Sequence, residues 1–302
     1  AVTPKVDASN SNEILIERTE LFTQDSVRDG DVDVLFMIDN SGSMANKQKR
    51  LSESLGLFID KFLDKKINFK MAITTTDGTK NKNGKMIGDA NKLTSDYLKL
   101  VGKTQFMSYF SQMTKVGIDG SGVEQGLKTS SAFFDRYSSS FLRNDAYLAL
   151  VEISDEDDQS EKSVKDYVTK YQSLKKNKGM VKIYSIVTLK LPMDNTLSDS
   201  FGEHYKEASL LTGGTVSEIK DDFSTILTDL GTNIVNLVDS FSLAEIPYDN
   251  NPLVYVNKVL VTNGWSYNSI SHSIKFESTH IPAAGAQIEI HYKVKANVIG
   301  AI

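Results

Sequence analysis

The chain has 302 residues, of which 40% are hydrophobic and 24% are charged, a composition typical of a globular protein with one large and one smaller domain. The net charge is −5 and no dense block of Lys and Arg occurs, so we do not expect nucleic-acid binding. The sequence contains no Cys, which excludes disulfides, thiolate catalysis and cysteine-based zinc sites, and no apolar run approaches the roughly 20 residues of a transmembrane helix.

Residues 1–29 are interpreted as an N-terminal arm. Its start lacks the charged-then-apolar pattern of a signal peptide, so we expect any export signal to have been removed. The polar residues 8–12 suit either a tether behind a processed N-terminus or a frayed end. The alternating apolar residues near 13–22 predict a strand that joins the C-terminal β module.

Strand-like and helix-like segments alternate over residues 30–241. The apolar run 33–38 predicts a buried strand, and helical spacing predicts a helix over 45–63. Further strands are predicted at 70–76, 146–153, 181–189 and 215–217, separated by periodic helical segments. This order predicts an α/β fold with a doubly wound, mostly parallel sheet flanked by helices. The polar connection 77–112 is interpreted as a surface excursion or a partner-binding rim.

The pattern changes over residues 242–302, which are rich in β-branched and aromatic residues and predict a small antiparallel β module. Asn263-Gly264 between two such runs predicts a hairpin. Because some sixty residues make a thin core, we expect the strand near 13–22 to complete this module, so that the α/β domain is an insertion in a β domain. Trp265 and Tyr267 are expected to pack in the core of the module, with sugar or partner contact as the alternative.

A group of oxygen-bearing side chains follows the predicted strands. Asp39, Ser41 and Ser43 come directly after the first strand, Ser121 precedes a helix expected to begin near Val123, and Asp155 follows the strand at 146–153. Loops at the carboxyl ends of parallel strands converge on one crevice. Carboxylate and hydroxyl oxygens are hard ligands suited to Mg²⁺, with Mn²⁺ or Ca²⁺ as alternatives. These residues therefore predict a divalent-metal site.

In these residues the chain resembles the von Willebrand factor A (VWA) family over about 33–239. That family carries a metal-ion-dependent adhesion site (MIDAS) with a DxSxS loop, a second-loop Thr and a third-loop Asp. Here DxSxS is Asp39, Ser41 and Ser43, Asp155 matches the third-loop Asp, and Ser121 stands where many members have Thr. The resemblance implies that the three Ser hydroxyls bind the metal directly and the two Asp carboxylates act through water. It also implies that a partner's acidic group completes the coordination.

Other charged residues receive weaker roles. Asp157 and Asp158 are candidates for the rim or for a second cation site. The favoured interpretation is a solvated acidic loop before a helix, in which the two carboxylates also complement the N-terminal dipole of that helix. Asp31 and Asp33 are interpreted as residues at the start of a strand. None of the four His residues falls within the predicted constellation as a general base, so we do not expect an enzyme.

The sequence and the resemblance together predict metal-dependent adhesion or protein–protein binding, in which a cation coordinates an acidic group of a protein partner. The resemblance also leads us to expect a protein of bacterial type that is extracellular, at the cell surface or periplasmic. One alternative is a surface-assembly scaffold in which the β module anchors or oligomerises the protein. A metal-assisted hydrolase is a further, less favoured alternative. The sequence leaves the ligand and the oligomeric state open.

Overall fold

The computed structural model describes residues 15–24, 30–190, 199–238, 240–277, 279–283 and 285–295. The chain divides into two compact units, one formed by residues 28–244 and the other by residues 1–27 together with 245–302. Residues 8–12, interpreted above as a tether, lie outside the described residues. Whether these units are folding domains with the predicted limits 1–29, 30–241 and 242–302 stays a prediction.

The α/β unit is built on a five-stranded sheet with the order β3-β2-β4-β5-β6, in which every neighbouring pair is parallel. The strands are β2 (Asp31–Ile38), β3 (Asn68–Thr75), β4 (Tyr147–Ser154), β5 (Val181–Val187) and β6 (Val216–Glu218). From β2 the chain moves to β3 on one side and then returns to β4 on the other side. The carboxyl ends of β2 and β4 are therefore adjacent at the point where the strand order reverses.

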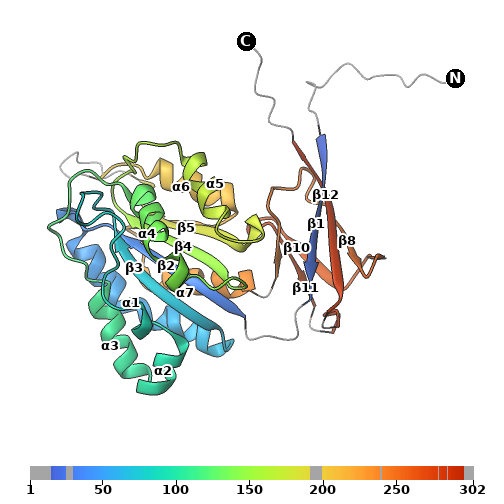
Figure 1. The fold of residues 1–302 in the computed structure, drawn as a ribbon, viewed down its shortest axis with the longest axis horizontal. Helices are drawn as coiled ribbons and strands as arrows, with labels where there is room; N and C mark the ends of the chain where they lie inside the picture. Colours follow the sequence, from blue (N-terminus) through green and yellow to red (C-terminus); the bar gives the residue numbers. More distant parts are fainter. Residues whose placement is uncertain are drawn as a thin grey trace, which may run out of the picture. The chain divides into compact units, whose positions relative to one another are not determined.

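Helices cover both faces of this sheet (Figure 1). One face carries α1 (Ala45–Asp64), α2 (Ser95–Val101), α3 (Lys103–Met113) and α7 (Phe223–Val238). The other carries α4 (Gly126–Phe141), α5 (Val164–Gln172) and α6 (Glu203–Thr212). Short 3₁₀ turns are η1 (Gly42–Met44), η2 (Ala90–Lys92) and η3 (Lys178–Met180), and the unit ends with β7 (Phe241–Ser242). The predicted fold class is thus confirmed.

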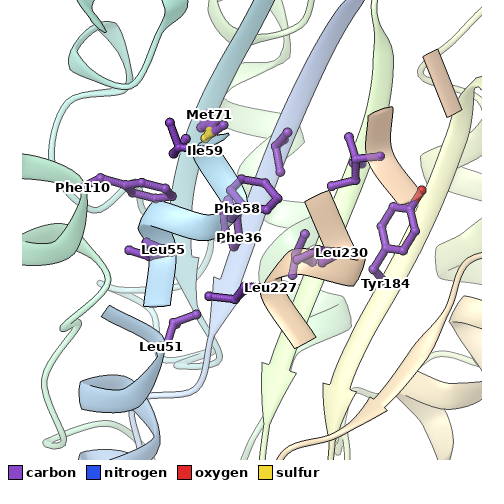
Figure 2. Packing of buried hydrophobic residues seen from close by; sticks show 14 of the residues in the cluster. Phe36, Leu51, Leu55, Phe58, Ile59, Met71, Phe110, Tyr184, Leu227 and Leu230 are labelled. Carbon is purple, nitrogen blue, oxygen red and sulfur yellow. The ribbon is translucent and has the colours of Figure 1, made fainter. Parts of the chain in front are cut away.

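Phe36 of β2 lies at the centre of the larger core cluster (Figure 2). Its ring meets those of Phe58 from α1 and Phe110 from α3 in edge-on contacts, with ring centroids 5.6 and 5.7 Å apart. Leu227 and Leu230 of α7 belong to the same cluster. Because β2 is buried on both faces, its alternate side chains pack against helices on either side of the sheet. This packing fixes the position of β2, and the DxSxS loop begins at its carboxyl end.

The interpretation of 77–112 as a surface excursion is wrong, because this segment contains α2 and most of α3. Thr94 caps α2 by accepting a hydrogen bond of 3.1 Å from the backbone N–H of Tyr97. Phe106 and Phe110 of α3 are fully buried. The polar run at 79–85 dominated the interpretation of this segment, although apolar residues return from Met86 onward.

The β unit contains a four-stranded antiparallel sheet with the order β1-β12-β8-β9. Its strands are β1 (Leu15–Thr23), β8 (Leu253–Val256), β9 (Val259–Val261) and β12 (Gln287–Lys295). β1 pairs with β12 over nine residues, from Leu15 opposite Lys295 to Thr23 opposite Gln287. A separate hairpin joins β10 (Trp265–Asn268) to β11 (Ser273–Phe276). A strand near the N-terminus therefore supplies one edge of the sheet.

The hairpin predicted at Asn263-Gly264 is wrong, because the strands on either side of it, β9 and β10, belong to different sheets. The chain instead reverses between β8 and β9 at Asn257-Lys258, both of which have positive φ angles, of 50° and 69°. Two consecutive residues with positive φ make the tight turn typical of a two-residue hairpin. Gly264, with φ of 76°, turns the chain toward the next sheet.

Candidate metal site

The loop after β2 is organised around Asp39. The strand ends at Ile38, and the backbone N–H of Ser41 donates a hydrogen bond of 2.7 Å to Asp39 Oδ1. Asp39 and Ser41 are buried, whereas Gly42 is exposed and Ser43 is half-buried. The loop therefore places its carboxylate on the protein side and its second hydroxyl nearer the solvent.

Side-chain hydrogen bonds join this loop to the end of β4. Ser154, the last residue of β4, donates a bond of 2.7 Å from its hydroxyl to Asp39 Oδ2. The Ser41 and Ser43 hydroxyl oxygens lie 3.1 Å apart, and Ser43 donates a bond of 3.0 Å to Asp155 Oδ1. Four of the five predicted ligand residues, together with Ser154, are thus brought together at the carboxyl edge of the sheet.

The fifth residue, Ser121, lies in a loop that contacts the first loop through its neighbour Gly120. The N–H of Gly120 donates a bond of 2.9 Å to the Asn40 carbonyl, and a Cβ at Gly120 would lie 2.5 Å from Asn40 Oδ1. The close contact between the two loops therefore requires glycine at position 120. The half-buried Ser121 hydroxyl accepts a bond of 3.1 Å from the N–H of Val123. No hydrogen bond among the described residues joins this hydroxyl to Asp39, Ser43 or Asp155.

Asp157 and Asp158 are engaged with the first turns of two helices. Asp158 accepts bonds of 3.0 Å from the N–H of Leu127 at the start of α4 and of 2.9 Å from the Ser160 hydroxyl. Asp157 accepts from the backbone N–H and the ring Nδ1 of His204, at 3.0 and 2.7 Å, at the start of α6. Asp158 is buried, so the interpretation of a solvated loop is wrong for this residue. The two carboxylates accept hydrogen bonds at the starts of α4 and α6, and not at the start of α5, the helix that follows their loop. A role at the rim or in a second cation site stays a prediction.

Sequence reasoning missed Glu124. Its side chain is fully buried, and neither carboxyl oxygen has a hydrogen-bond partner in the part of the chain that the structure describes. Burial and the negative charges of Asp39 and Glu156 together raise the pKa of Glu124 from 4.5 to about 8, while the Thr76 side chain acts in the opposite direction. The available signal was an acidic residue three positions after Ser121, in a segment already assigned to the site.

Two lysines bring positive charge to the same edge of the sheet. Lys47, in the first turn of α1, forms an ion pair with Asp155 Oδ2 and lies 3.3 Å from Asp199 Oδ1. Lys220 pairs with Asp199 Oδ2 at 2.8 Å. Burial raises the pKa of Asp39, and the charge of Asp155 adds to this, while the hydrogen bonds from Ser154 and Ser41 act in the opposite direction. The site thus combines buried carboxylates with the ammonium groups of Lys47 and Lys220.

The donor set fits a hard divalent cation. Carboxylate and hydroxyl oxygens are the ligands of Mg²⁺ and Ca²⁺, and Glu124 offers two buried oxygens that lack partners. Within the described ranges, no group of three or more His, Cys, Asp and Glu side chains is arranged to hold a metal by itself. A cation at this position would therefore depend on the Ser hydroxyls as well as on the carboxylates.

Among the described residues, no helix is both long and apolar enough to cross a bilayer.

Comparison with known proteins gives structural similarity alone. No protein family and no curated protein matches the sequence. Solved structures that it resembles include proximal thread matrix protein 1 from the mussel byssus, at 9% identity and a TM-score of 0.44, covering 69% of this chain and 48% of that one. The same matrix protein with a zinc-occupied MIDAS motif matches at 12% identity and a TM-score of 0.45, covering 72% of this chain and 48% of that one.

The pilus adhesin SpaC of Lactobacillus rhamnosus GG, in its open conformation, matches at 12% identity and a TM-score of 0.43, covering 97% of this chain and 43% of that one. The chain thus spans less than half of the length of each of these proteins. At TM-scores below 0.5 these similarities carry no functional weight, and the function proposed below rests on the geometry of the site. What the structure itself establishes is an α/β unit with a parallel sheet flanked by helices, and a small antiparallel β unit.

Proposed function

We propose that the α/β unit binds a divalent cation, Mg²⁺ in the first place, at the carboxyl ends of β2 and β4, and that the bound cation holds an acidic group of a protein partner. The observation that carries this proposal is the hydrogen-bonded assembly of Asp39, Ser41, Ser43 and Asp155 at the point where the strand order reverses. The function is binding, not catalysis, and it suits an adhesive protein that is secreted or displayed on a bacterial surface.

The residues divide by their place in the site. The Ser41 and Ser43 hydroxyls and, after rotation away from Val123, the Ser121 hydroxyl would hold the cation as neutral ligands. Asp39 and Asp155 would balance its charge, and Ser154 holds Asp39 in position. A bound divalent cation supplies positive charge and a coordination position for an incoming carboxylate. That carboxylate would arrive from the side of Gly42 and Ser43, which is open to solvent.

Calorimetric titration of Mg²⁺ and Mn²⁺ into metal-stripped protein tests the proposal. We expect saturable binding to the wild-type chain and its loss in Asp39→Ala. The matched control is Asp145→Ala. Asp145 is exposed, lies just before β4 and pairs with Lys176. Equal binding by Asp39→Ala and wild type, or no binding by either, would overturn the metal site.

A second titration addresses the partner. Synthetic peptides with a single Glu are titrated into the metal-loaded protein, with the matching Gln peptides as controls. Metal-dependent binding of a Glu peptide supports capture of an acidic group. If no Glu peptide binds better than its Gln counterpart in the presence of metal, the proposed role of the partner's carboxylate is wrong.

Assembly through the β unit is a second candidate, favoured by the position of β1. This nine-residue strand is the edge of its sheet, and Leu21 on it is 65% exposed. An edge strand of this length can pair with a strand of another chain. Concentration-dependent oligomers in sedimentation experiments, lost when β1 carries Leu21→Lys while metal binding is kept, would support assembly; a monomer at all concentrations would rule it out.

A further inference from the structure

Glu124 is held by its backbone between two segments of the α/β unit. It forms an isolated antiparallel bridge with Asp77, just beyond the end of β3, and the next residue, Gln125, donates a bond of 3.1 Å to the Thr76 carbonyl. On the other side, its carbonyl accepts a bond of 2.6 Å from the N–H of Gln159. The backbone contacts fix the position of Glu124 before any ligand binds.

The carboxyl group at this fixed position lacks a partner. It is fully buried, and neither of its oxygens accepts a hydrogen bond within the described part of the chain. An ionised carboxylate in such a place is strongly destabilising unless a cation or hydrogen-bond donors compensate it. Glu124 therefore requires either a proton or a cation.

The lysines nearest to this edge of the sheet are paired with other carboxylates. Lys82 lies 3.1 Å from Asp77, and Lys47 pairs with Asp155 and Asp199. The charge that acts most strongly on Glu124 is negative and comes from Asp39. Two buried carboxyl groups thus lie close together on the inner side of the site.

We propose that Glu124 is a further ligand of the divalent cation on its buried side, whereas Gly42 and Ser43 lie toward solvent. This inference rests on the proposed function. The carboxylates of Asp39, Glu124 and Asp155 do not by themselves form a group arranged to hold a metal among the described residues, so the Ser hydroxyls would complete the site. Lys47 is shared between Asp155 and Asp199 and therefore compensates Asp155 only in part. A divalent cation compensates the remaining negative charge more strongly than a monovalent cation does.

The geometry also separates the two sides of the cation. Glu124 and Asp39 are fully buried and hold the inner side, while Ser43 and Ser121 are half-buried and lie toward solvent. Glu124 consequently increases affinity for the cation without occupying the face from which a partner's carboxylate would approach.

Mn²⁺ titration followed by electron paramagnetic resonance, which distinguishes free from bound Mn²⁺, tests this proposal in the whole 302-residue chain. Glu124→Gln keeps the shape of the side chain and removes its charge. We expect it to bind Mn²⁺ at least about tenfold more weakly than wild type, the loss seen when a group that supports a metal site is removed. The matched control is Glu152→Gln. Glu152 is also fully buried, but it bonds to Ser130, and the acidic group acting on it is Asp158.

Thermal unfolding with and without Mn²⁺ gives an independent readout and verifies that each variant is folded. Binding to the native state raises the melting temperature, and we expect this rise in wild type and Glu152→Gln but not in Glu124→Gln. If Glu124→Gln binds Mn²⁺ as tightly as wild type while Asp39→Ala loses Mn²⁺ binding, the role of Glu124 is overturned and the proposed function stands. Absence of Mn²⁺ binding to wild type would overturn both.

If Glu124→Gln does not fold, Glu124→Asp is the second variant, because it keeps the negative charge on a side chain that is shorter by one methylene. Weaker Mn²⁺ binding by a folded Glu124→Asp supports the proposal, and wild-type affinity overturns it.

Discussion

Ser154 donates a hydrogen bond of 2.7 Å to Asp39 Oδ2. This bond joins the last residue of β4 to the first residue after β2. The Ser154 hydroxyl also accepts a bond of 3.1 Å from the N–H of Glu156. One side chain thus fixes both the carboxylate of the DxSxS loop and the start of the loop that carries Asp155. Such support of a metal-binding residue commonly determines affinity.

Ser154→Ala should weaken cation binding about tenfold, because Asp39 loses the donor that orients it. It should also lower the free energy of unfolding by about 1–3 kcal/mol, since a buried carboxylate oxygen is left without a partner. Calorimetry and urea denaturation measure the two effects. Ser52→Ala, at a buried serine of α1 that bonds within its own helix, is the control. Wild-type metal affinity in Ser154→Ala would contradict the prediction.

Lys47→Met should strengthen cation binding. The ammonium group pairs with Asp155 beside the site, so it repels a bound cation and competes for the same carboxylate. Its removal should increase affinity about fivefold, on the order of 1 kcal/mol. Titration of Mn²⁺ at low and high salt measures this, and exposed Lys49→Met on the same helix is the control. An unchanged or reduced affinity would show that Lys47 does not oppose the cation.

The stability of the metal-free protein should depend on pH through Glu124. Its pKa is raised from 4.5 to about 8 by burial and by the charges of Asp39 and Glu156, so the folded state holds the proton more tightly than the unfolded state. The stability contribution is present below pH 4.5 and is lost as the pH rises toward 8. The slope for one proton is at most about 1.4 kcal/mol per pH unit.

Urea denaturation between pH 5 and 8 measures this dependence in chelator-treated protein. We expect the free energy of unfolding to fall more steeply with pH in wild type than in Glu124→Gln. Glu53→Gln, at an exposed position on α1, is the control and should follow wild type. Identical slopes for wild type and Glu124→Gln would show that Glu124 is not the group that releases the proton.

Asp33→Ala should destabilise the α/β unit and leave metal binding unchanged. Asp33 is fully buried and accepts a bond of 2.8 Å from Arg143 Nε, while Lys175, whose side chain is 1% exposed, lies 3.3 Å away. Removal of the carboxylate leaves a buried ammonium group without its partner, at a cost of about 3–5 kcal/mol. Asp33 lies about 20 Å from Asp39 along the strand direction, too far to touch a cation there.

Urea denaturation and Mn²⁺ titration check this prediction together. Asp31→Ala is the control, because Asp31 is half-buried and 3.8 Å from Arg143 Nη1, so its loss should cost much less. A large loss of metal affinity in a folded Asp33→Ala would contradict the assignment of Asp33 to structural support.

Deletion of residues 1–24 should disrupt the β unit. It removes β1, which pairs with β12 along its whole length, and leaves that edge without its hydrogen bonds. We expect faster amide hydrogen exchange in β12 and unchanged Mn²⁺ affinity. Deletion of residues 1–14, which leaves β1 in place, is the control. Full protection of β12 in the longer deletion would show that β1 is dispensable.

Much of the α/β unit could be predicted from local pattern. The apolar run at 33–38 and the helical spacing at 45–63 correspond to β2 and α1, because strands buried on both faces and amphipathic helices leave direct traces in the order of residues. Turns were less predictable. Asn263-Gly264 has the composition of a hairpin, yet the chain reverses at Asn257-Lys258, since pairing with β12 selects which residues of the run form strands.

The sequence by itself determined the loop chemistry of Asp39, Ser41 and Ser43, because alternate residues of one tight turn are neighbours in any fold that forms it. It also indicated Asp155, because parallel strands end at a common edge. Only the tertiary structure decided that Ser154 would orient Asp39, that Lys47 would pair with Asp155, and that Glu124 would be buried beside Asp39 without a partner. Burial and charge proximity depend on segments far apart in the chain, and no local pattern encodes them.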